Sequence, residues 1–78
     1  MKLPRGVPGE RLVRALERVG YRVVRQKGSH VRLRNEGPPV HGITVPLHNP
    51  LKTGTLYGIL SEVAQARAIT IESIIDLL

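Results

Sequence analysis

The sequence contains no cysteine, tryptophan or phenylalanine, and only two tyrosines among its 78 residues. Without cysteine, the chain forms neither a disulfide nor a thiolate metal site. The scarcity of aromatic rings argues against a platform on which single-stranded bases stack, because such a platform needs several exposed rings. The sequence shows no apolar run long enough to cross a bilayer and no secretory signal. We therefore expect a cytoplasmic protein with no membrane partner.

Acidic residues are also scarce relative to basic ones. Twelve Lys and Arg stand against six Asp and Glu, which gives a formal net charge of +6 and a pI near 10.9. This excess of positive charge favours a polyanionic partner, either a nucleic acid or an acidic protein. A chain of this length holds one small domain with a modest core, so we predict a single domain over residues 1–78.

Three segments have the pattern of helices. In residues 9–19 the apolar side chains recur at the spacing of one helical face, and Gly20 follows as a stop signal. A second helix is predicted to begin at residues 53–55 and to carry one apolar stripe. The stripe consists of Leu56, Ile59, Leu60, Val63 and Ala64. Residues 69–78 predict a short third helix with Thr70 as its N-cap.

From Tyr21 onward the apolar period changes to two, which is typical of strands. The segments YRVVRQK and HVRLRN are joined by Gly28 and Ser29, so we predict a hairpin. In its second strand Val31 and Leu33 are expected to face the core. The opposite, solvent-facing side then carries His30, Arg32 and Arg34.

Residues 35–42 are predicted to be a turn, because their glycines and prolines cannot sustain a central strand. A third strand follows at residues 43–48, and Pro46 within it indicates an edge position because it lacks a ladder donor. The predicted fold class is α+β. The order is α-β-β-β-α with a short extra C-terminal helix, and a three-stranded antiparallel sheet has its helices on one face.

The three histidines are candidates for chemistry. His30 is either a general acid or base, a role to which imidazole is suited, or an exposed strand residue on a basic face, and the pattern alone leaves both open. Antiparallel pairing is expected to place His48 opposite His30 or one pair away. In that position His48 is either a helper in proton transfer or phosphate binding, or a strand-end residue with local hydrogen bonds. His41 falls in the predicted turn, where chemistry is not expected. The three lack the spacing of a metal site, so no metal and no cofactor is predicted.

Gly28 and Ser29 form the predicted hairpin turn. Gly28 is predicted to supply a permissive turn conformation, since no P-loop pattern surrounds it. Ser29 is predicted to be a turn residue and not a nucleophile, because no base and carboxylate accompany it.

The segments GYRVVRQKGSHVRLR and ITVPLHNPLKTGTLYGIL, in this order and spacing, resemble the HicA family of bacterial toxins. Members of that family are small ribonucleases, called mRNA interferases, that pair with a HicB antitoxin. The resemblance implies a fold like that of double-stranded-RNA-binding domains. It also implies that His30, which follows the Gly-Ser pair, is the catalytic histidine, with mRNA as substrate and a HicB-like antitoxin as partner.

If the resemblance holds, the basic residues around His30 bind RNA, because cations steer a phosphodiester and stabilise its developing charge. The residues assigned to RNA binding are Arg25, Lys27, Ser29, Arg32 and Arg34. Two other functions remain open: a non-catalytic RNA-binding module of the double-stranded-RNA-binding type, and a basic protein-interaction domain. The broad apolar side of residues 69–78 either packs inside the domain or extends an antitoxin interface.

Overall fold

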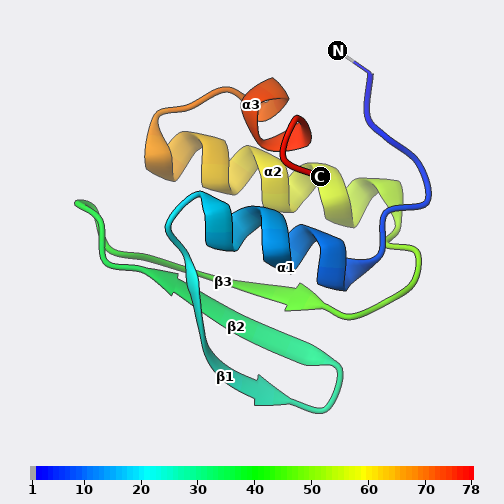
Figure 1. The fold of residues 1–78 in the computed structure, drawn as a ribbon, viewed down its shortest axis with the longest axis horizontal. Coiled ribbons are helices and arrows are strands. Elements are labelled where there is room, and N and C mark those ends of the chain that lie inside the picture. Colours follow the sequence, from blue (N-terminus) through cyan, green and yellow to red (C-terminus); the bar gives the residue numbers. More distant parts are fainter. Residues whose placement is uncertain (1) are drawn as a thin grey trace.

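The computed structural model describes residues 2–78. Its elements, in chain order, are α1 (Gly9–Arg18), β1 (Arg22–Lys27), β2 (His30–Asn35), β3 (His41–Pro46), α2 (Thr53–Arg67) and α3 (Ile71–Ile75). The three strands form one antiparallel sheet, and the helices cover one face of it, leaving the other face open (Figure 1). The predicted α+β class, the element order and the three-stranded sheet are all confirmed.

The strands lie in the order β1-β2-β3, so β2 is central and β3 is an edge strand, as Pro46 indicated. Leu33 of β2 pairs with Ile43 of β3, and Arg32 pairs with Thr44. The side chains of β2 alternate between exposed and buried along its whole length, with Val31 and Leu33 in the core. The predicted division of β2 into a core side and a solvent side is therefore confirmed.

The predicted limits of the third strand are wrong at both ends. The strand begins at His41, because β3 includes His41 and Gly42, which the composition had assigned to a turn. Glycine and proline exclude a central strand, but an edge strand tolerates them. At the other end β3 stops at Pro46, two residues earlier than predicted, although the Leu47 N–H still donates to Ser29 O over 2.6 Å.

The helices α1 and α2 bury the apolar faces that the sequence predicted. Leu12, Val13 and Leu16 of α1 are in the core, and Gly20 follows the helix at a φ of 101°, a conformation that glycine adopts without strain. The buried residues of α2 are the predicted Leu56, Ile59, Leu60, Val63 and Ala64. At its C-terminal end, Ala68 takes the left-handed conformation that glycine usually supplies.

The start of α1 lies directly against the end of β3. Gly9 is buried, and a Cβ there would collide with the backbone of Pro46 and Leu47. The Gly9 N–H also donates to His48 O over 2.8 Å. Together with the bond from Leu47 to Ser29, these contacts connect α1, the end of β3 and the hairpin turn at one corner of the domain.

The last helix packs inside the domain. Thr70 caps α3, since its Oγ1 accepts a hydrogen bond from Ser73 N over 3.1 Å, as predicted. Ile74 is fully buried, and most other apolar side chains of the segment, Ile71, Ile75 and Leu78, pack against the core. Packing, and not an open interface, therefore accounts for most of this apolar side. In residues 2–78 every helix is too short or too polar to span a bilayer.

Candidate active site on the open face of the sheet

His30 is the first residue of β2 and follows a tight two-residue turn. Lys27 and His30 are the last cross-strand pair before Gly28 and Ser29. Gly28 has a φ of 58° and Ser29 does not have a positive φ, which is the pattern of a type II′ hairpin turn with glycine first. Gly28 therefore has the turn role that the sequence predicted. The turn holds His30 at the outermost end of the hairpin.

The His30 side chain points away from the core. It lies on the exposed side of the alternation in β2, and its Cα partners are Lys27 on one side and Pro46 on the other. Within residues 2–78 its ring accepts and donates no hydrogen bond to another side chain or backbone group. The backbone of His30 is thus held by two neighbouring strands, while its imidazole is open to a ligand.

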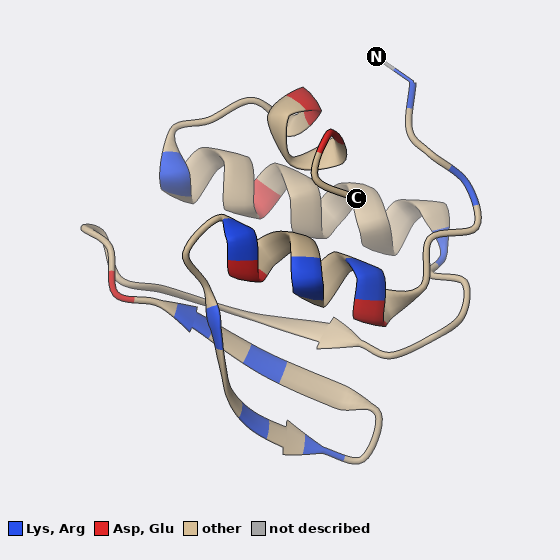
Figure 2. Cartoon of the chain, viewed as in Figure 1, with Lys and Arg blue, Asp and Glu red and all other residues tan. Residues whose placement is uncertain are grey.

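Positive charge is concentrated on the face that carries His30. Residues directly opposite each other on paired strands share a face of the sheet. Arg25 pairs with Arg32 and Lys27 pairs with His30, so the cations of β1 and β2 lie side by side. No strand contains Asp or Glu, and the basic segments of the sheet are confined to β1 and β2 (Figure 2).

A β-bulge adds one further arginine to this face. The register shifts between Val23 and Arg25, so that Val24 is the extra residue and Arg22 pairs with Arg34. Without the bulge, strict alternation from Arg25 would put Arg22 on the helix side of the sheet. The sequence-based assignment missed Arg22; the consecutive valines in RVVR, which break the alternation, were the signal of a bulge. The basic face consists of Arg22, Arg25, Lys27, Arg32 and Arg34, with His30 at its end.

Two arginines of the basic face have protein partners. The Arg32 Nη1 donates to Thr44 Oγ1 over 3.1 Å, and the guanidinium lies over Gly42, where a Cβ would collide with it. The Arg34 Nε donates to Glu36 Oε2 over 2.7 Å, and both side chains are about half exposed. Arg22, Arg25 and Lys27 form no ion pair with any residue from 2 to 78.

His48 lies beyond the end of β3, next to the start of α1. Because His30 pairs with Pro46, the last residue of β3, His48 is not directly opposite His30 but two residues further along the chain. Its side chain is exposed, and its backbone carbonyl accepts the hydrogen bond from Gly9. The structure therefore brings His48 to the same corner as the turn residue Ser29, whose own side chain forms no hydrogen bond within residues 2–78.

His41 belongs to a separate cluster at the opposite end of β2. Its Nδ1 and the Tyr21 hydroxyl are 2.7 Å apart, and its Nε2 lies 2.8 Å from Glu62 Oε2 of α2. The two rings meet edge to face at 5.8 Å. Both ring nitrogens are thus bonded within the protein, so His41 joins the sheet to α2 and is not open to a ligand.

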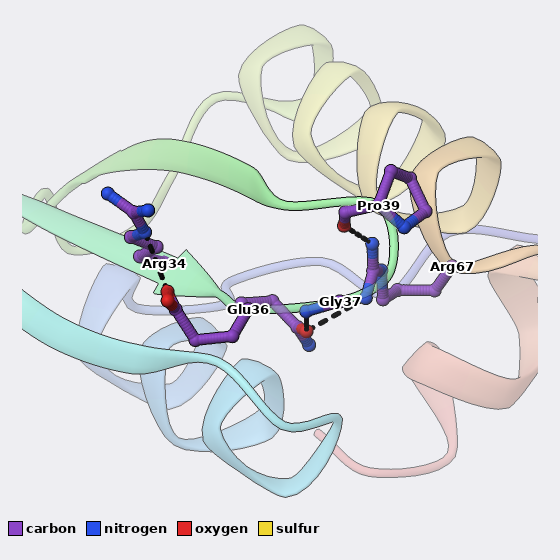
Figure 3. A network of polar contacts seen from close by, with 6 residues as sticks. Arg34, Glu36, Gly37, Pro39 and Arg67 are labelled. Carbon is purple, nitrogen blue, oxygen red and sulfur yellow. Dashed lines mark hydrogen bonds and ion pairs between the residues drawn. The ribbon is translucent and has the colours of Figure 1, made fainter.

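A polar network next to this cluster holds the connection between β2 and β3. The Asn35 Oδ1 accepts hydrogen bonds from Gly37 N and from Arg67 Nη1, each over 2.8 Å. A second nitrogen of the Arg67 guanidinium donates to the carbonyl of Pro39, while Arg34 and Glu36 meet nearby on the sheet (Figure 3). The hydrogen bonds of Arg67 therefore attach this connection to α2. Among residues 2–78, no group of three His, Cys, Asp or Glu side chains gathers in a way that could hold a metal ion.

The family model described as HicA toxin of bacterial toxin-antitoxin matches residues 9–66, which is most of the chain. The matched span contains α1, the whole sheet and nearly all of α2, and therefore every residue of the basic face. No curated protein and no solved structure matches the chain.

Proposed function

The chain belongs to the HicA toxin family of bacterial toxin-antitoxin systems, and from this premise we propose that it is an endoribonuclease that cleaves mRNA with His30 as general acid or base. The observation that carries the proposal is the position of His30. Its ring is exposed and unbonded at the end of a face that carries five Lys and Arg side chains. A phosphodiester attracted to that face meets an imidazole, a group that can accept or donate a proton.

RNA supplies its own nucleophile, so the proposed reaction needs no metal. The 2′-oxygen attacks the adjacent phosphorus, a new O–P bond forms, and the bond from phosphorus to the 5′-oxygen breaks. The 2′-hydroxyl gives up one proton and the leaving 5′-oxygen takes one up. His30 carries out one of these transfers, and His48 or water carries out the other. The products are a 2′,3′-cyclic phosphate and a free 5′-hydroxyl.

The cations around His30 have distinct roles in this proposal. Lys27 is directly opposite His30, so its ammonium stabilises the charge that develops on the reacting phosphate. Arg32 is held by Thr44 and presents its remaining N–H groups in a fixed direction. Arg25 and Arg34 bind neighbouring phosphates, and Ser29 contributes a hydroxyl at the turn.

Membership of a toxin-antitoxin family implies a HicB-type antitoxin, and we propose that this partner covers the basic face. An acidic surface complements the five cations, and a partner seated there denies RNA access to His30. The toxin would act in the cytoplasm, where its mRNA substrate is translated.

Cleavage of single-stranded RNA in the presence of a chelator tests the function. General acid–base catalysis contributes about 10²–10⁴-fold, so His30→Ala is expected to lower the cleavage rate by roughly that factor. RNA affinity and the unfolding transition should change little, since the side chain is exposed. Arg14→Ala on α1 serves as a control, because Arg14 is also exposed but lies on the helix side.

Each alternative has its own result in this experiment. A folded His30→Ala protein with near-normal activity would remove His30 from the mechanism. If the wild-type protein binds RNA but never cuts it, the chain is a non-catalytic RNA-binding module. Activity that disappears in chelator and returns with a divalent ion would contradict the metal-independent reaction. His48→Ala, assayed alongside, shows whether His48 is the second proton carrier.

A further inference from the structure

We infer that Arg22 is a substrate-binding residue and that the enzyme holds a single RNA strand on only one side of the cleaved phosphate. The strand runs along the hairpin of β1 and β2, from His30 toward Arg22. This inference rests on the proposed function, because it assumes that the reacting phosphate lies at His30.

The first support is the register of the hairpin. The bulge at Val24 pairs Arg22 with Arg34 and so turns the Arg22 side chain to the basic face. A bulge interrupts the ladder and re-aims a side chain, and such features recur next to functional sites. Here its effect is to extend a row of cations by one position, with Arg22 exposed at its end.

The second support is the distribution of unpaired charge. At the far end of the basic face, Arg34 is bonded to Glu36, which offsets its charge and fixes the direction of its guanidinium. Arg22, directly opposite, has no carboxylate partner among residues 2–78. Arg22 is therefore the uncompensated cation at the end of the hairpin away from His30.

The third support is the geometry of the basic face. Its three cross-strand positions are Lys27 with His30, Arg25 with Arg32, and Arg22 with Arg34. Neighbouring strands are about 4.8 Å apart, so these cross-strand positions form one narrow track along the hairpin. Within it Arg32 is the exception, because its guanidinium is directed over β3 to Thr44. Such a track accommodates one extended sugar-phosphate backbone. The second backbone of a duplex would lie across a wide minor groove, beyond the reach of these side chains.

His30 occupies one end of this track, which makes the contacts one-sided. Beyond it the hairpin turns at Gly28 and Ser29, and its neighbour on β3 is the uncharged Pro46. No cation of the sheet lies past His30 in that direction. Nucleotides on the Arg22 side of the cleaved phosphate are therefore bound, and those on the other side are not.

The test uses oligonucleotides with a single ribose at a mapped cleavage site in an otherwise 2′-deoxy strand, so that only one phosphate is cleavable. The strand is lengthened by up to three nucleotides on its 5′ side or on its 3′ side, and kcat/KM is measured. With wild-type protein we expect a gain from lengthening on one side only. Arg22→Ala should reduce that gain by about two- to fivefold, the effect of one solvent-exposed ionic contact, and leave the shortest substrate unaffected.

Measurements of binding affinity test the role of Arg22 even if no cleavage occurs. On His30→Ala protein with an all-deoxy strand, adding Arg22→Ala should flatten the slope of log affinity against log salt by about 0.7, the value for one phosphate of a single strand. Arg14→Ala is the matched control and should leave the slope unchanged. A duplex of the same sequence should bind more weakly than the single strand.

Other results overturn the inference. Equal gains on both sides of the cleaved phosphate would contradict one-sided binding. An Arg22→Ala protein that matches wild type on every length and in its salt slope would show that Arg22 does not bind the substrate. Tighter binding of the duplex would exclude the single-strand track. Absence of cleavage by the wild-type protein contradicts the proposed function instead, and the salt slope then still decides the role of Arg22.

Discussion

At the scale of single residues, the buried hydroxyl of Tyr21 makes the stability of the folded state depend on pH. The side chain is 3% exposed, and its hydroxyl bonds to His41. Burial raises the pKa of Tyr21 above its ordinary value of 10.0; the positive charge of Arg67 acts in the opposite direction, and Glu62 adds to the increase. The folded state thus favours the neutral hydroxyl.

The raised pKa of Tyr21 predicts a loss of stability at alkaline pH. Since the pKa is higher in the folded than in the unfolded chain, the stabilisation is complete below about pH 10 and disappears as the pH rises through the folded pKa. Tyr21→Phe should cost about 1 kcal/mol near pH 7, through the lost hydrogen bond, and should remove this part of the alkaline decline. Denaturant unfolding between pH 7 and 11 measures both effects.

Tyr57→Phe is the control for this experiment, because Tyr57 is 44% exposed. Its unfolding free energy should follow the wild-type curve at every pH. If the Tyr21→Phe protein loses stability above pH 10 as steeply as wild type, titration of Tyr21 does not cause the decline.

At the scale of elements, the contact between α1 and β3 determines the corner at which His30 lies. Gly9 allows the first turn of α1 to touch the backbone of Pro46 and Leu47. Because backbone atoms cannot swing aside as a side chain can, any larger residue must push the helix away from the strand. The same strand end is bonded to Ser29, so a displacement here reaches the turn that precedes His30.

Two glycine-to-alanine substitutions are predicted to have opposite effects. Gly9→Ala should lower the free energy of unfolding by about 1–3 kcal/mol, the usual cost of overpacking, and should also slow cleavage. Gly58→Ala in α2 should raise it by about 1 kcal/mol, because alanine favours the helix and the new methyl group meets no atom within 4 Å. Chemical denaturation of both variants checks the signs; a neutral or stabilising Gly9→Ala would mean that the corner is not tightly packed.

At the scale of the whole molecule, charge is divided between the two sides of the sheet. The open face carries five cations and one bonded carboxylate, Glu36 at Arg34, whereas α1 on the helix side mixes Glu10 and Glu17 with its arginines (Figure 2). In our proposal a single surface therefore attracts both RNA and an acidic partner. This arrangement makes binding of the two ligands mutually exclusive in our proposal.

Competition between antitoxin and RNA follows from this arrangement. On His30→Ala protein, a HicB-type antitoxin should displace a bound single-stranded RNA, and raising the salt concentration should slow its association more than its dissociation. Fluorescence anisotropy of labelled RNA during antitoxin titration measures the displacement. Simultaneous binding, with continued cleavage by the wild-type toxin in the complex, would show that the antitoxin does not act by covering the basic face.

Local sequence was sufficient for the parts of this protein whose structure depends on near neighbours. The apolar spacing of α1 and α2 identified the faces that are buried, and alternation in β2 identified the side on which His30 lies. The Gly28 turn and the Thr70 cap were predictable because each depends on the chemistry of a few adjacent residues. These features needed no knowledge of the partner strands.

Only the tertiary structure decided which residues meet across the sheet and between the layers. The bulge at Val24 and the position of Arg22 depend on pairing with β2, and the start of β3 depends on pairing of His41 with Asn35 of β2. These partners are far apart in the chain, and no local periodicity encodes their register. The chain's own alternation therefore determined that a basic face exists, whereas pairing between strands determined how far that face extends from His30.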